Sequence, residues 1–259
     1  MKKFILFLGR AGTNFFVHFY RVCSYLGAAL GQLRYIHFYR RQIVEQMYRL
    51  GIGSLPLIMA LSMFTGLATT IQTAYQISSY IPKYIVGSIV FQSEMLELAP
   101  TLMALVLAGR VGAGIASEIG TMKVSEQVDA LISMGVDPVG YLMMPRIIAG
   151  VTMFPLITIF AVLVAVGGGH YAATTMMGVS TTDFVRGMRE AYRFKDVWVG
   201  LIKSTFYGGI ITLLGCYLGM ETDQGAKGVG MSATATVVWS SSFILIMDYI
   251  LTRTLLKFS

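Results

Sequence analysis

The chain has 259 residues, of which 55% are hydrophobic and only 13% are charged. A soluble domain normally carries about 25% charged residues, so this composition excludes an ordinary water-soluble globule and predicts an integral membrane protein. The net charge of +7 is expected to come from basic residues that flank membrane segments and meet anionic headgroups. Because no basic run is interleaved with a soluble fold, nucleic acid is not expected as a partner.

The N-terminal region, residues 1–49, mixes aromatic and basic side chains without a long uncharged run. This pattern favours an amphipathic helix that lies in the membrane interface, and the alternative is a first span with indistinct boundaries. The aromatic and basic residues alternate along the region: Phe15, Phe16, Phe19 and Tyr20 with Arg10, Arg21, Arg34, Arg40, Arg41 and Arg49. We therefore divide the chain into an N-terminal basic interfacial region, 1–49, and a transmembrane domain, 50–259.

Apolar segments long enough to cross a bilayer follow this region, since a helix needs about 20 residues to do so. The predicted spans are residues 52–76, 86–117, 147–169, 197–219 and 234–255. Only helices and closed barrels satisfy their backbone groups in lipid, and the alternating ten-residue pattern of a barrel is missing. The predicted fold class is therefore an all-α integral membrane bundle. With the N-terminus in the cytoplasm, residues 118–146 would be cytoplasmic, and residues 172–196 and the C-terminus would lie on the far side.

Charged residues inside the predicted spans are candidates for a substrate path. Glu94 and Glu97 lie in the second span, three residues apart on one helix face, while Lys203 lies in the fourth and Asp248 in the fifth. An ionisable group at mid-depth costs about 3 kcal/mol or more, so such groups face a cavity, pair, or lie near the interface. Lys203 could contact a lipid phosphate, form a structural ion pair with Glu97 or Asp248, or extend toward the interface.

The second span and the segment after it contain two further patterns. Small residues recur every four positions, which lets another helix approach closely in lipid: Ala108, Gly112 and Ala116, and beside them Gly109, Ala113 and Ser117. After Gly120, a short amphipathic helix is predicted at 122–134. Its two faces are apolar (Val124, Val128, Leu131 and Ile132) and polar (Glu126, Gln127, Asp129 and Ser133). Gly135 and Pro138 would end it. Such a helix suits docking into a groove on a partner, or it simply caps the bundle.

Several function classes lack their sequence signatures. No Gly-x-x-x-x-Gly-Lys-[Ser/Thr] motif occurs, so the chain does not bind ATP in the P-loop manner. An intramembrane enzyme is disfavoured because no catalytic constellation has a recognisable spacing. The histidines are scattered, so no metal site is predicted: His18, His37 and His170. An ion-coupled secondary transporter that uses Glu97, Lys203 and Asp248 as a proton relay is the alternative function, although five spans and no internal repeat speak against it.

The chain from about residue 50 onward resembles the MlaE/YrbE permease family, the membrane subunits of ABC transporters that work with MCE-domain proteins. The resemblance is carried by these stretches: Glu97-Leu-Ala-Pro100, Leu107-Ala-Gly-Arg-Val-Gly112, Glu118-Ile-Gly-Thr-Met-Lys-Val-Ser-Glu-Gln-Val-Asp-Ala-Leu131, Val136-Asp-Pro138, Leu201-Ile-Lys-Ser204, Gly225-Ala-Lys-Gly-Val-Gly230 and Ala233-Thr-Ala-Thr-Val-Val238. A departure is Leu96, where some relatives carry a basic residue before the glutamate.

The resemblance implies a permease subunit without its own ATPase site and without a directly bound cofactor, because ATP would be used by a partner ABC ATPase. It implies a homodimer in the inner membrane that moves phospholipid to or from a periplasmic MCE-domain protein. The region matching 121–134 would be the coupling helix that contacts the ATPase. The residues expected to take part in this coupling are Thr121, Lys123, Glu126, Gln127, Asp129 and Leu131.

Overall fold

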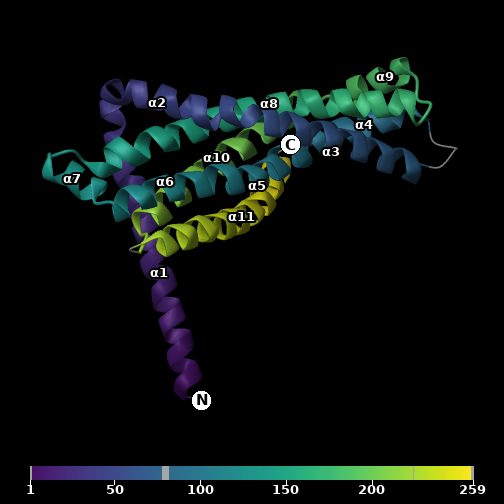
Figure 1. Ribbon diagram of the computed structural model, residues 1–259. Coiled ribbons are helices and arrows are strands. Elements are labelled where there is room, and N and C mark those ends of the chain that lie inside the picture. The colour runs from purple at the N-terminus through teal and green to yellow at the C-terminus, as the bar shows by residue number, and fades with distance from the viewer. Residues whose placement is uncertain (1, 78–81, 224, 258–259) are drawn as a thin grey trace.

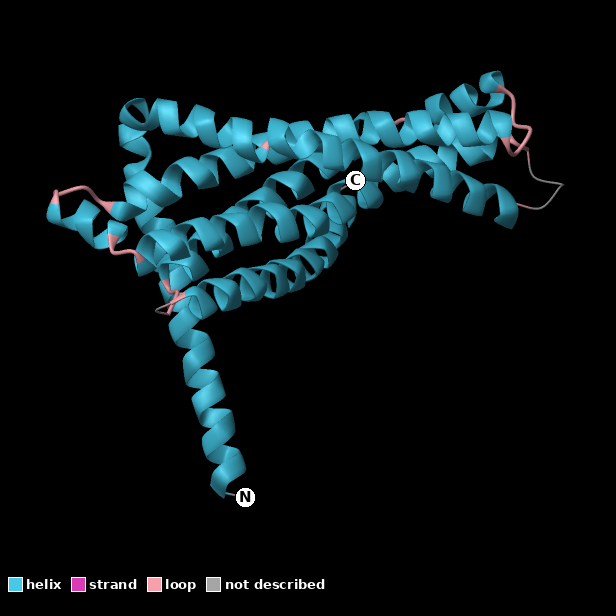
Figure 2. Cartoon of the chain, in the orientation of Figure 1, coloured by secondary structure: helices cyan, strands magenta, loops and turns pink. Residues whose placement is uncertain are grey.

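The computed structural model describes residues 2–77, 82–223 and 225–257, and every regular element within these ranges is helical (Figure 2). Five helical runs in the described part of the chain are long and apolar enough to cross a membrane. They are Phe16–Gln76, Tyr84–Val124, Val139–Thr175, Phe194–Met220 and Ala226–Lys257. Each contains one of the predicted spans, so the structure confirms the all-α integral membrane fold.

The N-terminal region forms two helices, α1 (Lys2–Gly31) and α2 (Ile36–Leu50), joined by a single turn of 3₁₀ helix. Helix α1 leaves the bundle at the end that carries α7 and extends away from it (Figure 1). Its C-terminal half is held to α10, because Arg21 forms an ion pair with Glu221 at 2.5 Å and His18 Nδ1 lies 2.5 Å from the Tyr217 hydroxyl.

Helix α2 belongs to the bundle, which refines the predicted single interfacial region. It packs along α8, where Ile43 lies in one apolar cluster with Met144 and with the half-buried Met47 and Ile147. A short 3₁₀ turn, Ile52–Ser54, then leads directly into α3 (Leu55–Gln76). The interfacial position of residues 1–49 therefore stays a prediction, with α2 packed on α8.

Helix α3 crosses the bundle beside α8 (Met144–Thr175), and the two run in the same direction in close contact. At 1.5 Å per residue, the 22 residues of α3 are about 33 Å long, enough for the hydrocarbon core. Glycines permit the close approach, since a Cβ atom on Gly66 would overlap the Ala165 carbonyl and one on Gly168 would lie 2.8 Å from the Met63 carbonyl oxygen. Small residues at such contacts are typical of membrane helix pairs.

The second run is one long, irregular helix. Its successive parts are α4 (Tyr84–Ser93), a π-helical stretch (Glu94–Leu102), α5 (Met103–Leu107), a second π-helical stretch (Ala108–Gly112) and α6 (Ala113–Val124). Pro100 lies inside the first π-helical stretch, and because proline has no backbone N–H it interrupts the regular hydrogen-bond ladder. Single-turn π-helical segments are frequent at functional sites.

The predicted small-residue stripe is buried within the chain itself. Ala108 and Ala116 are 0% exposed. A Cβ atom on Gly112 would lie 3.2 Å from both Ile211 of α10 and Thr236 of α11. The helices that approach this stripe are therefore the chain's own α10 and α11, whereas Cβ atoms on the neighbouring Gly109 and Gly114 would meet nothing within 4 Å.

The remaining helices place two short segments at opposite ends of the bundle. The helices are α7 (Gln127–Ser133), α9 (Thr181–Ala191), α10 (Phe194–Met220) and α11 (Ala226–Lys257). Figure 1 shows α7 at one end, near the start of α8, and α9 at the other, beside α4. This arrangement agrees with a chain that crosses five times and turns at α7 and α9.

Candidate functional site

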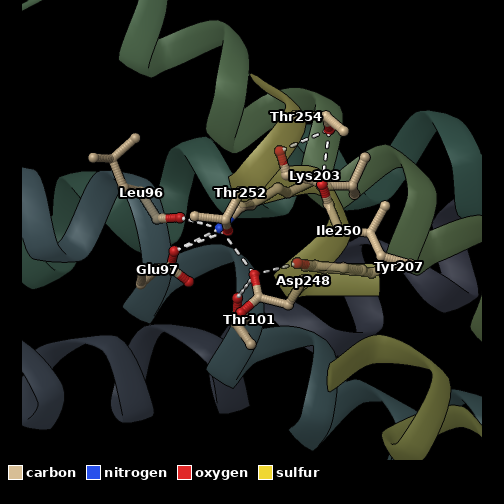
Figure 3. A network of polar contacts seen from close by, with 10 residues as sticks. Leu96, Glu97, Thr101, Lys203, Tyr207, Asp248, Ile250, Thr252 and Thr254 are labelled. Atoms are coloured by element: carbon tan, nitrogen blue, oxygen red, sulfur yellow. Dashed lines mark hydrogen bonds and ion pairs between the residues drawn. The ribbon is translucent and has the colours of Figure 1, made fainter. Parts of the chain in front are cut away.

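Lys203 is the centre of a polar network inside the bundle (Figure 3). It lies on α10 and is 0% exposed. Its Nζ atom is 2.7 Å from Glu97 Oε1, 2.8 Å from Asp248 Oδ1 and 3.0 Å from the Leu96 carbonyl oxygen. Three spans that are distant in sequence therefore converge on one ammonium group.

Hydroxyl groups complete this network. Tyr207 donates a hydrogen bond to Asp248 Oδ1 at 2.7 Å, and Thr101 donates one to the same oxygen at 3.3 Å. Thr252 donates a hydrogen bond to Glu97 Oε1 at 3.2 Å. We call the six side chains that meet here the Lys203 network: Glu97, Thr101, Lys203, Tyr207, Asp248 and Thr252 (Figure 3).

Sequence reasoning missed the three hydroxyl residues, although a signal for them exists. Each follows a charged residue of the network by four positions: Thr101 after Glu97, Tyr207 after Lys203, and Thr252 after Asp248. Residues four apart lie on the same helix face, so a hydroxyl at that spacing can serve the same polar site. The recurrence on three spans would have pointed to all of them.

Glu94, the fourth residue of the predicted path, lies apart from the network. Its side chain is 0% exposed and accepts a hydrogen bond from Thr69 of α3 at 3.4 Å. Its Oε2 atom has no hydrogen-bond partner among the described residues. The structure thus brings Glu97, Lys203 and Asp248 together and turns Glu94 toward α3.

In this conformation Lys203 forms the ion pair, one of the three interpretations of its sequence position, and the phosphate contact stays a prediction. An ammonium has three donors, and Glu97, Asp248 and Leu96 use all of them. The side chain is 1% exposed, so it does not extend to the interface, and it forms an ion pair with both carboxylates. Leu96 contributes its backbone carbonyl, so this contact does not depend on whether a leucine or a basic side chain occupies the position.

One ammonium and two carboxylates leave the Lys203 network with an excess negative charge. Glu97 is the most accessible of the three, with 43% of its side chain exposed against 21% for Asp248. Because an unpaired charge is costly in a bilayer, Lys203 must retain an anionic partner whenever Glu97 moves away. Asp248 would be that partner, since Tyr207 and Thr101 also hold it beside Lys203.

The predicted amphipathic helix is shorter than 122–134. Helix α6 continues to Val124, and Glu126 then adopts a left-handed conformation with φ of 60°, so α7 begins only at Gln127. The chain leaves α7 at Gly135, whose φ is +76° and whose N–H donates to the Ile132 carbonyl. A residue in the left-handed region commonly ends a helix in this way.

The faces of α7 agree with the prediction except at one residue. Val128 is buried at 5% and Leu131 is half-buried, while Glu126 and Asp129 are exposed. Ile132, predicted on the apolar face, is 57% exposed and lies in the last turn of this short helix, which ends at Ser133.

The other predicted coupling residues have local contacts. Lys123 donates to the carbonyl of Met220, the last residue of α10, at 2.5 Å. A lysine at this position satisfies an otherwise unpaired carbonyl and complements the negative end of the helix dipole. The Thr121 hydroxyl donates to the Ser117 carbonyl at 2.7 Å, and the Gln127 amide donates to the Ser125 hydroxyl at 3.0 Å. Lys123 therefore links the end of α6, just before α7, to the end of α10.

An ion-pair cluster at the α7 end connects three helices, and sequence reasoning assigned it no role. Glu118 of α6 pairs with Arg49 of α2 at 3.3 Å and with Arg146 of α8 at 3.1 Å. The Arg146 side chain is 5% exposed and also donates to the Leu142 carbonyl at 2.6 Å. The helix that leads into α7 is thus joined to α2 and α8.

Comparison with known proteins identifies the class of this bundle. The family model described as "Permease MlaE" matches residues 43–254. A probable ABC transporter permease protein of Rickettsia typhi is 37% identical over 219 residues, which are 85% of each chain. One of Synechocystis is 39% identical over 212 residues, 82% of this chain and 81% of the relative. The Arabidopsis protein TRIGALACTOSYLDIACYLGLYCEROL 1 is 35% identical over 211 residues, 82% of this chain and 60% of the relative. The family match and these relatives show that the chain belongs to the MlaE family of ABC transporter permeases.

Proposed function

We propose that this permease moves phospholipid between the inner membrane and a periplasmic MCE-domain protein, driven by ATP hydrolysis on a separate ABC ATPase subunit. The Lys203 network carries the proposal. A phospholipid joins a charged headgroup to apolar chains, and an apolar bundle that transports it needs a charged site within the membrane. The name of the Arabidopsis relative includes that of a diacylglycerol lipid, which supports a lipid substrate.

The geometry of the network suggests how a phosphate is accepted. Lys203 has no free donor while Glu97 and Asp248 are both in place. Glu97 is the more exposed of the two carboxylates, whereas Asp248 is also held by Tyr207 and Thr101. In the proposed step, Glu97 swings outward and a lipid phosphate takes its place at Lys203. The ammonium then keeps two anionic partners throughout.

Two copies of the chain are proposed to enclose the lipid, because five spans are too few to surround a molecule with two acyl chains. Helix α11 supports this, since it supplies Asp248 to the network while much of its surface is uncovered in the single chain. Its exposed apolar residues include Val238, Trp239, Leu245, Ile246 and Tyr249, which are between 48% and 65% exposed. A second copy packed on this surface would place its own network near the first.

Helix α7 is proposed to be the mechanical link to the ATPase. It projects at one end of the bundle (Figure 1) and exposes Glu126 and Asp129 together with the apolar Ile132 and Met134, which are 57% and 69% exposed. Exposed apolar groups beside carboxylates suit a groove with an apolar floor and a basic rim. Placing α7 in the cytoplasm puts α9 and the C-terminus in the periplasm.

Purification of the tagged chain from its native membranes, with mass spectrometry of bound proteins and lipids, tests this function. We expect an ABC ATPase, an MCE-domain protein and phospholipid, with no ATP turnover by the chain alone. Recovery of the chain without any ATPase, combined with proton-driven transport in vesicles, would overturn the proposal in favour of a secondary transporter.

A further inference from the structure

Apart from Lys83, which donates to the Gly178 carbonyl at 3.0 Å, three basic residues at the α9 end of the bundle have no ion pair within the described ranges: Arg189, Arg193 and Lys195. All three are exposed. Arg186 on the same helix differs, because it binds Glu190 at 2.8 Å and its guanidinium lies 4.9 Å from the Tyr84 ring centre. The Glu190 hydrogen bond raises the pKa of Arg186 above its usual value. Arg186 therefore has its partners within the protein, whereas Arg189, Arg193 and Lys195 can contact an anion outside it.

The carboxylates nearby do not neutralise these three cations. Glu190 is paired with Arg186. Asp183 is at the start of α9, where its carboxylate accepts a hydrogen bond from Ser180 at 2.8 Å. Asp196 is only 9% exposed and lies in the first turn of α10, where the helix dipole stabilises a negative charge. Residues 181–196 hold four basic and three acidic side chains, so a net positive charge remains, and its unpaired cations lie between α9 and α10.

Aromatic side chains are interleaved with these cations. Tyr192, Phe194 and Trp198 are 53%, 66% and 53% exposed, and the rings of Phe194 and Trp198 meet edge to face at 6.1 Å. Trp and Tyr gather where membrane spans enter the headgroup layer. Here they stand at the start of α10, where a membrane span begins. Rings at this position are expected to hold the neighbouring cations at the depth of lipid phosphates.

The buried side of α9 fixes which face points outward. Phe184 is 0% exposed and packs with Val86 and Val90 of α4 in one apolar cluster. A Cβ atom on Gly187 would overlap the Tyr84 carbonyl. Helix α9 is therefore held closely along α4 (Figure 1), and its charged face is turned away from the bundle.

We propose that Arg189, Arg193 and Lys195, with Tyr192, Phe194 and Trp198, form a docking surface for the headgroups of anionic phospholipids in the leaflet at the α9 end. Membrane proteins concentrate Lys and Arg in cytoplasmic loops. Helix α9 lies at the end opposite α7, and α7 is proposed to be cytoplasmic, so α9 would lie on the periplasmic side. A basic surface on that side works against the usual charge bias, and attraction to anionic lipid accounts for it. The inference does not depend on what the permease transports.

The two tryptophans of the chain make a local test possible. Trp239→Phe leaves Trp198 as the sole tryptophan. This background protein is placed in nanodiscs with equal amounts of phosphatidylglycerol and phosphatidylcholine, with bromine near the headgroup end of the acyl chains of one lipid or the other. We expect brominated phosphatidylglycerol to quench Trp198 fluorescence more strongly, because the three cations would raise the ratio of phosphatidylglycerol to phosphatidylcholine beside them roughly a hundredfold.

Substitution and salt each give an independent check. Arg189→Gln, Arg193→Gln and Lys195→Gln together should remove the difference between the two lipids. The control Arg40→Gln, Arg41→Gln and Lys227→Gln, which removes three exposed charges near the α7 end, should retain it.

In the background protein with no further substitution, raising salt from 0.1 to 1 M shortens the screening length from about 10 Å to 3 Å and should reduce the difference. Equal quenching by both lipids, or a preference that survives the triple variant or 1 M salt, would overturn the proposal. If the surface instead binds an acidic protein, the two brominated lipids should quench Trp198 equally.

Discussion

Replacing Lys203 with methionine removes the ammonium from between two carboxylates while keeping most of the side-chain volume. The Lys203 side chain is 1% exposed, while Glu97 and Asp248 are 43% and 21% exposed. Removing one partner of a fully buried pair costs about 3–5 kcal/mol. Water can reach both carboxylates in part and lowers this cost, and Tyr207 and Thr101 continue to donate to Asp248. We therefore expect a loss of about 2–3 kcal/mol.

Thermal unfolding in detergent, followed by intrinsic fluorescence, measures this loss. One kcal/mol shifts the midpoint of a domain of this size by about 2–4 °C, so Lys203→Met should lower it by roughly 5–10 °C. Lys227→Met, at an exposed lysine in the first turn of α11, should leave it unchanged. Adding Glu97→Gln and Asp248→Asn to Lys203→Met should recover most of the loss, because the network becomes neutral. An unchanged midpoint for Lys203→Met, or a triple variant no more stable than the single one, would refute the reasoning.

Other expectations concern coupling, the α7 end, helix packing and topology. Glu126→Lys with Asp129→Lys sets like charges against a basic groove and should cost several kcal/mol of ATPase binding; an inserted dimer that keeps stoichiometric ATPase and normal transport would contradict the coupling role of α7. Glu118→Gln removes the carboxylate that joins two arginines and should lower the thermal midpoint by about 2–8 °C, as expected for 1–2 kcal/mol, and an unaltered midpoint would argue against the cluster. Gly66→Leu should greatly reduce the folded fraction on size exclusion, whereas Gly167→Leu, which meets nothing within 4 Å, should not; equal yields would contradict the close packing of α3 on α8. A reporter active only in the periplasm should be active when fused to the C-terminus, and cytoplasmic activity instead would reverse the proposed topology.

The spans could be predicted from the sequence because a helix that crosses a lipid bilayer needs a continuous apolar segment. Long apolar runs with few charges stand out by composition, and each predicted span lies inside a longer helical run of the structure. Helix α2 could not be placed in the same way. Its charges resemble those of an interfacial helix, and its position along α8 depends partly on the pairing of Arg49 with Glu118, 69 residues away. The start of α7 was missed because nothing in the sequence marks Glu126, a non-glycine residue, for a positive φ.

The candidate site was predictable in part, for a related reason. A charge inside an apolar run is conspicuous, so Glu94, Glu97, Lys203 and Asp248 could all be named in advance. Which of them meet depends on helix rotation and irregularity, and the π-helical stretch Glu94–Leu102 shifts the face on which each carboxylate lies. As a result Glu94 points toward α3 while Glu97 reaches Lys203. The pairing of helices in space decided the network, and periodicity alone does not contain that information.

Transfer of labelled phospholipid tests the central claim most directly. The permease is reconstituted with its ABC ATPase in liposomes that contain a fluorescent phospholipid, and a soluble MCE-domain protein is added as the other lipid carrier. We predict movement of label between liposome and carrier that requires ATP and is lost in Lys203→Met protein that still assembles with the ATPase. Transfer at the same rate without ATP, or with Lys203→Met, would contradict a permease that moves phospholipid through the Lys203 network.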